Sequence, residues 1–206
     1  MIVYAHRGLH SRAVPENTMA AFRAAADRGY GIETDLRTDV DGRLLLFHDR
    51  CKRDRRVDEL THAELAALVG YDVPTLDDLL AADLGAPLNL EVKTTAALAA
   101  FEPYLPDLPA HVLVSSFIHA IPAAVAGHGV ESALLLASTP LDSLPAPRPH
   151  LATVVWDFNM AAAETLATAT AQGYRNIVYG PRMADEHAFL VSQGVHAIIS
   201  DRPDRV

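Results

Sequence analysis

The chain has 206 residues, which suits one well-buried core and is short for two domains. Half of its residues are hydrophobic and 21% are charged, as in an ordinary globular protein. Its formal net charge of −9 argues against nucleic acid or an anionic membrane surface as a partner.

The first segment of the chain is a short apolar run that reaches His6 at once. No basic region followed by a long apolar stretch precedes it, so no signal peptide is predicted. The apolar stretches elsewhere are far too short to span a bilayer. The lone Cys51 excludes an intramolecular disulfide. We therefore expect a cytoplasmic protein without a membrane span.

Eight short apolar runs recur along the chain, and most are followed by a segment with helical character. The runs are Ile2–Ala5, Gly31–Leu36, Leu88–Val92, Val112–Ser115, Ala133–Leu136, Thr153–Trp156, Asn176–Tyr179 and Ala197–Ser200. This alternation predicts parallel strands joined by crossovers. Eight such units predict one α/β domain over residues 1–206, a closed (β/α)8 TIM barrel. The alternative is an open doubly wound sheet, although no glycine-rich dinucleotide motif follows any strand.

The predicted helices lie in the crossovers between these runs. They span Thr18–Arg28, Leu76–Ala82, Thr95–Tyr104, Ile118–Gly127, Met160–Gln172 and Ala184–Gln193. Asn17 and Thr75 are suited to cap the first two at their N-termini. Before Thr153, prolines at 140, 145, 147 and 149 leave room only for a short helix or a loop.

The stretch Thr38–Val73 does not fit a single strand-and-crossover unit. It has a turn at Asp41-Gly42, then a second apolar run that ends in His48, a charged run and a short helix near His62–Leu68. We predict an insertion after the second strand, lying over one end of the barrel and not folding alone.

Three carboxylates occupy strand positions that face the barrel mouth. Glu33 and Asp35 are two residues apart, which places both side chains on one face of the second strand. Glu91 lies on the third strand. Carboxylates this close repel each other unless a cation or a proton intervenes. The set predicts a hard divalent ion, Mg²⁺ or Ca²⁺ with Mn²⁺ as a further candidate. The alternative is that Glu33 and Asp35 point to solvent.

Basic side chains accompany these carboxylates. His6 and Arg7 end the first strand, His48 follows the apolar run of the insertion, and Lys93 follows Glu91 by two residues. Histidine transfers protons near neutral pH, and arginine donates to phosphate oxygens. A cation, basic side chains and two proton-transfer groups are what cleavage of a phosphodiester requires.

The sequence resembles the glycerophosphodiester phosphodiesterase family from end to end. The segments that carry the resemblance are Ala5-His6-Arg7-Gly8, Pro15-Glu16-Asn17-Thr18, Ile32-Glu33-Thr34-Asp35, Asp41-Gly42, His48-Asp49, Pro74-Thr75-Leu76, Leu90-Glu91-Val92-Lys93, Ser115-Ser116-Phe117 and Ile198-Ile199-Ser200-Asp201-Arg202-Pro203.

The resemblance implies a β/α barrel that hydrolyses a glycerophosphodiester to an alcohol and glycerol 3-phosphate through a cyclic phosphate. It implies one divalent ion on Glu33, Asp35 and Glu91 and an acid–base pair of His6 and His48. Further substrate contacts are expected in two pairs, Arg7 with Lys93 and Phe117 with Tyr179.

Two departures from the family pattern concern the substrate. The Trp-Thr-x-Asn segment at the seventh strand is replaced by Val178-Tyr179-Gly180-Pro181-Arg182, where Tyr179 stands in for the tryptophan as an aromatic wall. The insertion is also short. The expected substrate is thus a small phosphodiester, which can be a less common glycerophosphodiester. The sequence does not predict the oligomeric state.

Two alternatives to this function stay open. A lysophospholipase D or sphingomyelinase D type of phosphodiesterase would need an apolar groove for an acyl chain, for which the polar run Arg53–Arg56 offers little. A non-catalytic barrel that only binds would not need all seven charged site residues.

Overall fold

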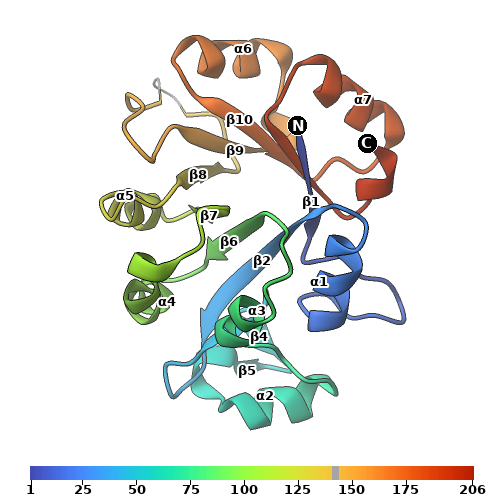
Figure 1. The fold of residues 1–206 in the computed structure, drawn as a ribbon, viewed down its shortest axis with the longest axis vertical. Coiled ribbons are helices and arrows are strands. Elements are labelled where there is room, and N and C mark those ends of the chain that lie inside the picture. Colours follow the sequence, from blue (N-terminus) through green and yellow to red (C-terminus); the bar gives the residue numbers. More distant parts are fainter. Residues whose placement is uncertain (141–143) are drawn as a thin grey trace.

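A closed ring of parallel strands organises the chain (Figure 1). The computed structural model describes residues 1–140 and 144–206. The strands of the ring are β1 (Ile2–His6), β2 (Gly31–Thr38), β6 (Leu88–Val92), β7 (Val112–Ser116), β8 (Ser132–Leu136), β9 (Thr153–Asp157), β10 (Arg175–Tyr179) and β11 (Ala197–Ser200). Because β1 pairs with both β2 and β11, the ring closes. All eight predicted runs and the TIM barrel are confirmed, and the open sheet is wrong.

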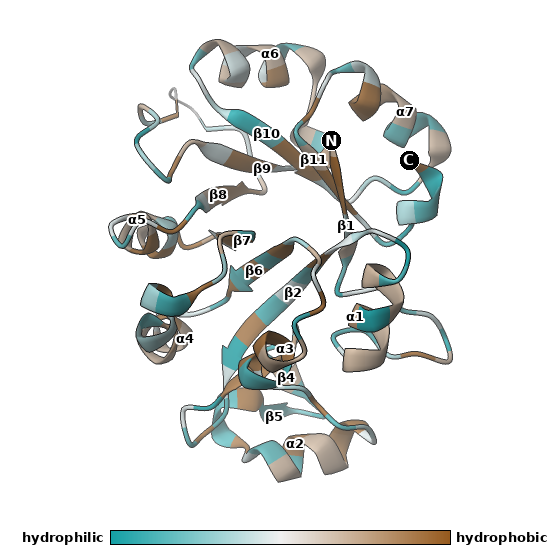
Figure 2. Ribbon diagram, viewed as in Figure 1, coloured by the Kyte–Doolittle hydropathy of each residue, from teal (hydrophilic) through white to brown (hydrophobic). Residues whose placement is uncertain are grey.

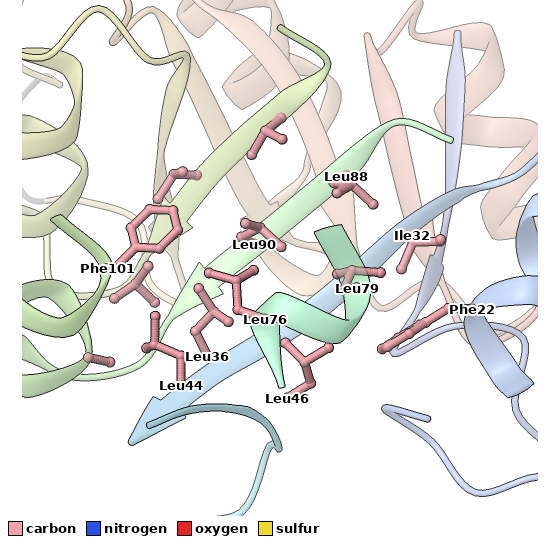
Figure 3. Close-up of a cluster of buried hydrophobic side chains, with 14 of the residues drawn as sticks. Phe22, Ile32, Leu36, Leu44, Leu46, Leu76, Leu79, Leu88, Leu90 and Phe101 are labelled. Atoms are coloured by element: carbon pink, nitrogen blue, oxygen red, sulfur yellow. The ribbon is translucent and has the colours of Figure 1, made fainter. Parts of the chain in front are cut away.

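The strands are buried on both faces, which explains their apolar sequences. Inside the ring, Tyr4, Leu135, Ile177 and Ile199 pack together. Outside it, side chains of β2 and β6 pack against helices, with Leu36 and Leu90 at the centre of the cluster in Figure 3. Burial on both faces is typical of parallel sheets covered by helices.

Helices cover the outside of the ring. They are α1 (Met19–Ala26), α3 (Leu76–Ala81), α4 (Thr95–Phe101), α5 (Ala120–Ala126), α6 (Ala163–Ala171) and α7 (Ala184–Ser192), with short 3-10 helices η2 (Glu102–Asp107), η3 (Phe158–Met160) and η4 (Pro203–Arg205). The colouring in Figure 2 shows polar and apolar residues mixed along these helices. Within the described ranges, no helix has both the length and the hydropathy to cross a membrane.

One predicted helix feature differs from the structure. Thr18, and not Asn17, caps α1 by accepting a hydrogen bond from the backbone N of Ala21. Asn17 instead has a positive φ of 52°, which turns its side chain toward β2. Between β8 and β9, the described residues 137–140 and 144–152 form no helix, in line with their prolines. Thr75 caps α3 as predicted.

The insertion after β2 packs beside the ring and adds one strand to it. β3 (Leu44–Leu46) pairs antiparallel with the end of β2. The hairpin β4 (Cys51–Lys52) and β5 (Arg55–Arg56), the 3-10 helix η1 (Val57–Glu59) and the predicted short helix α2 (His62–Val69) follow. Phe47 and Leu65 belong to a small separate apolar cluster under this segment. The insertion lies beyond β2 in Figure 1, next to the barrel mouth.

Gly31 begins β2, and its Cα atom lies close to the ring of Tyr4 inside the barrel. A Cβ atom at this position would lie 2.6 Å from Cδ1 of Tyr4 and 3.1 Å from the carbonyl oxygen of Pro87. Tyr4 is buried inside the ring, so its side chain has little room to move. Any side chain at residue 31 therefore competes with the tyrosine ring.

We predict that Gly31→Ala destabilises the protein by about 1–3 kcal/mol through overpacking. Urea unfolding measures the change in free energy. The control is Tyr4→Ala, which removes the ring: in that background Gly31→Ala should cost much less, as a double-mutant cycle would reveal. An equal cost in both backgrounds contradicts the steric explanation.

Candidate active site

A cavity of about 240 Å³ opens at the carboxyl ends of the barrel strands. Eight of the nine predicted site residues line it: His6, Arg7, Glu33, His48, Glu91, Lys93, Phe117 and Tyr179. The ninth, Asp35, is almost fully buried and contacts Lys93 in the cavity wall. The structure thus brings together all of the residues selected from the sequence.

The three carboxylates form one buried cluster. Glu33, Asp35 and Glu91 each offer an oxygen, and these oxygens lie within 4.8 Å of one another. The pairing of β2 with β6 places Asp35 directly opposite Glu91. The solvent-facing alternative for Glu33 and Asp35 is wrong, since both residues are buried.

Burial and mutual repulsion change how these carboxyls titrate. Burial, with the nearby charge of Asp35, raises the pKa of Glu33 to about 7. Burial also raises the pKa of Glu91. For Asp35, burial opposes ionisation, but the ammonium of Lys93 outweighs it and lowers the pKa. Full ionisation of all three carboxyls is therefore unfavourable without a further positive charge among them.

The donor set fits a hard divalent cation. Its donors are carboxylate oxygens without thiolates, which suits Mg²⁺, Ca²⁺ or Mn²⁺. Oδ1 of Asp35 is buried and has no well-aligned hydrogen-bond donor. Its nearest charged neighbour is Nζ of Lys93, at 2.8 Å. A cation between the three carboxylates would use that oxygen and relieve their repulsion.

Two basic side chains border the carboxylates. Nζ of Lys93 lies 2.5 Å from Glu91 and 2.8 Å from Asp35. The Arg7 guanidinium donates to Glu16 at 2.8 Å, and its Nε lies 3.5 Å from Asp35. The backbone N of Arg7 also donates to Glu33 at 3.0 Å, from a residue with a φ of 56°. Both cationic groups therefore lie where the cavity meets the carboxylate cluster.

Asn17 positions Asp35 of the carboxylate cluster. Its place in the sequence did not indicate this role. Its Nδ2 donates to Asp35 at 2.9 Å, while its Oδ1 accepts from the Thr34 hydroxyl at 2.7 Å. The signal available was the segment Pro15-Glu16-Asn17-Thr18, which we interpreted as a helix start. Asn17 fixes one oxygen of Asp35 and leaves the other facing Lys93.

His6 is oriented by an acidic residue that sequence reasoning missed. Its Nδ1 lies 2.6 Å from Oδ1 of Asp201, so this nitrogen carries the proton that it donates to the carboxylate. Its Nε2 then faces Glu33 at 3.9 Å. Burial disfavours the imidazolium, but Glu33 and Asp201 outweigh it and raise the pKa of His6. The sequence feature that could have identified this residue is the segment Ser200-Asp201 at the end of β11.

His48 comes from the insertion and is held by contacts on both sides. Arg37 on β2 donates from Nε to the carbonyl oxygen of His48 at 2.7 Å, and the backbone N of Phe47 donates to the carbonyl of Asp35 at 3.0 Å. The ring Nδ1 lies 3.1 Å from Asp49. These contacts tie His48 to β2 at the edge of the cavity.

Phe117 and Tyr179 form an aromatic wall. Their ring centroids lie 6.2 Å apart with the planes at 85°, an edge-to-face contact. Phe117 follows β7 and is 45% exposed, whereas Tyr179 ends β10 and is half-buried. Burial and the Asp157 carboxylate raise the pKa of Tyr179, which keeps its hydroxyl protonated.

Two curated proteins that resemble this chain both carry the name glycerophosphodiester phosphodiesterase. The chain is 36% identical over 129 residues to the "Probable glycerophosphodiester phosphodiesterase 2" of Mycobacterium tuberculosis, over 56% of this chain and 48% of that protein. It is 33% identical over 146 residues to the glycerophosphodiester phosphodiesterase of Caldanaerobacter subterraneus, over 57% of this chain and 58% of that protein. The chain thus matches about half the length of these relatives.

A solved structure shares the fold over nearly its whole length. It is an Oleispira antarctica phosphodiesterase in complex with the product sn-glycerol-3-phosphate, with a TM-score of 0.83 and 24% identity. The match covers 100% of this chain and 94% of that one. The model of the Glycerophosphoryl diester phosphodiesterase family matches residues 6–119, more than half of the chain and all of the segment from His6 through Lys93. The chain therefore belongs to the glycerophosphoryl diester phosphodiesterase family.

Proposed function

We propose that the chain is a metal-dependent phosphodiesterase that hydrolyses a glycerophosphodiester to an alcohol and glycerol 3-phosphate. The observation that carries the proposal is a cluster of three buried carboxylates at the wall of a cavity that two histidines and two cationic side chains also line. The product described in the Oleispira structure is in keeping with this substrate class. The cytoplasmic location, the single domain and the absence of nucleic-acid partners stay predictions.

Each site residue has a role in this proposal. Glu33, Asp35 and Glu91 would hold one divalent ion, which supplies positive charge for the phosphoryl oxygens. Arg7 and Lys93 would bind the phosphate, since both lie at the edge of the carboxylate cluster. The aromatic wall of Phe117 and Tyr179 would contact the carbon chain of the substrate.

The attacking group in the proposed reaction belongs to the substrate. A neighbouring glycerol hydroxyl attacks phosphorus, one histidine takes its proton, and the other gives a proton to the departing alcohol oxygen. This produces a cyclic phosphate, which water opens while the two histidines exchange roles. An intramolecular hydroxyl gains from proximity, so the protein needs only to orient the diester and move protons.

We predict that activity depends on a divalent cation. A screen of glycerophosphodiesters with product identification should detect an alcohol and glycerol 3-phosphate. Chelation should abolish turnover, and Mg²⁺, Mn²⁺ or Ca²⁺ should restore it, because unneutralised carboxylates repel the anionic substrate. Lysophosphatidylcholine and bis(p-nitrophenyl) phosphate test the alternative functions. Full turnover after verified metal removal would contradict the proposal.

We predict that His6→Ala and His48→Ala each lower kcat by about 10²–10⁴-fold, the usual contribution of an acid–base group. His128→Ala, at an exposed helix end, is the matched control and should keep full activity. Thermal unfolding checks that each variant folds. A loss below about threefold at either site removes that histidine from the mechanism.

We predict that removing the neighbouring hydroxyl of the substrate slows turnover far more than it weakens binding. The comparison is glycerophosphocholine with its 2-deoxy analogue. Phosphorus NMR should show a transient cyclic phosphate from the former only. Equal rates for both substrates would exclude substrate-assisted attack and point to direct attack by water.

A further inference from the structure

A second cavity of about 400 Å³ adjoins the active-site cavity. Two residues, His6 and Tyr179, line both cavities, so they form the wall that the cavities share. The other lining residues come from the end of β9 and η3, from the segment between β10 and α7 with the start of α7, and from the position after β11; they include Asp157, Phe158 and Glu186. We call this space the adjoining cavity.

Each of the two cavities could hold one of the two alcohol groups that are esterified to the phosphate. The carboxylates and the two cationic groups lie in the smaller cavity, which therefore receives the phosphate and the glycerol arm. The adjoining cavity is then left for the alcohol that departs. His6 stands between them, with Nδ1 held by Asp201 and Nε2 3.9 Å from Glu33. A diester bound across the two cavities would have its scissile P–O bond next to His6.

The adjoining cavity carries more negative than positive charge. Three carboxylates and one guanidinium, that of Arg182, line it. Asp201 is paired with His6, and Glu186 accepts hydrogen bonds from the backbone N of Arg182 at 2.5 Å and of Met183 at 2.9 Å. These two carboxylates are thus already engaged by the protein.

Asp157 is the carboxylate whose partners are all neutral. Its Oδ1 accepts two hydrogen bonds from Asn159, both at 2.8 Å, and the hydroxyl of Tyr179 also contacts this carboxylate. In the part of the chain that the structure describes, no cationic side chain lies within ion-pair distance of it. It lies between two half-buried aromatic residues, Phe158 next in sequence and Tyr179 on the paired strand β10.

A carboxylate without a cationic partner, beside aromatic rings, is an environment that binds an organic ammonium group. We propose that the adjoining cavity binds the departing alcohol and that Asp157 makes it selective for alcohols with an ammonium group, such as choline or ethanolamine. The assignment of the cavity to the departing alcohol rests on the proposed function. The ammonium site itself can be tested without turnover.

The first experiment compares substrates that differ in the alcohol. The ratio of kcat/KM for glycerophosphocholine to that for glycerophosphoglycerol should fall about fivefold in Asp157→Asn, the effect of losing one partly exposed charge pair. Asparagine keeps an oxygen for the hydrogen bonds from Asn159. The control Asp185→Asn removes the same charge from α7 outside the cavity lining and should keep the wild-type ratio. An unchanged ratio in Asp157→Asn overturns the proposal.

The second experiment separates this proposal from the proposed function. Saturation-transfer NMR measures binding of choline and of its neutral isostere 3,3-dimethylbutanol to the full chain. Choline should bind better, and Asp157→Asn should remove the difference. If this holds while no glycerophosphodiester is hydrolysed, the proposed function fails and the ammonium site stands. Equal binding of the two compounds to the unaltered protein overturns the ammonium site whatever the activity.

Discussion

Repulsion between three buried carboxylates is the constraint on which the rest of this structure depends. The register of β2 and β6 places Asp35 opposite Glu91 and brings Glu33 to the same face. An uncompensated charge at such depth costs about 3–5 kcal/mol when a buried partner is removed. The ring of parallel strands is therefore stable only with compensating groups nearby.

The compensating groups come from three different segments of the chain. Lys93 continues β6, Arg7 follows β1, and Asn17 reaches β2 from the turn before α1. The positive φ values of Arg7 and Asn17 are part of the same solution, because they turn the chain back toward the carboxylates. Lys93 and Arg7 compensate the carboxylates from the edge of the cluster, and a divalent ion would take the place among the three oxygens.

The barrel and the site residues could be predicted because both follow from local pattern. Apolar runs mark the strands, and the carboxyl ends of parallel strands meet at one end of the ring, so Glu33, Asp35 and Glu91 had to converge there. The pairing of His6 with Asp201 is different, since the residues are 195 positions apart and meet only through ring closure. The role of Asn17 was hidden because a polar residue before a helix resembles a cap. Its neighbour Thr18 takes that role instead.

Ring closure also has a consequence for the order in which the chain can become active. β1 carries His6, and its partner β11, which closes the ring, is synthesised after β2 and β6. Asp201 follows β11 directly and is the residue that orients His6. A nascent chain can thus assemble the carboxylate cluster from β2 and β6 early, while its histidine remains unoriented. A chain truncated before β11 would therefore hold the carboxylate cluster beside a histidine that lacks its orienting carboxylate.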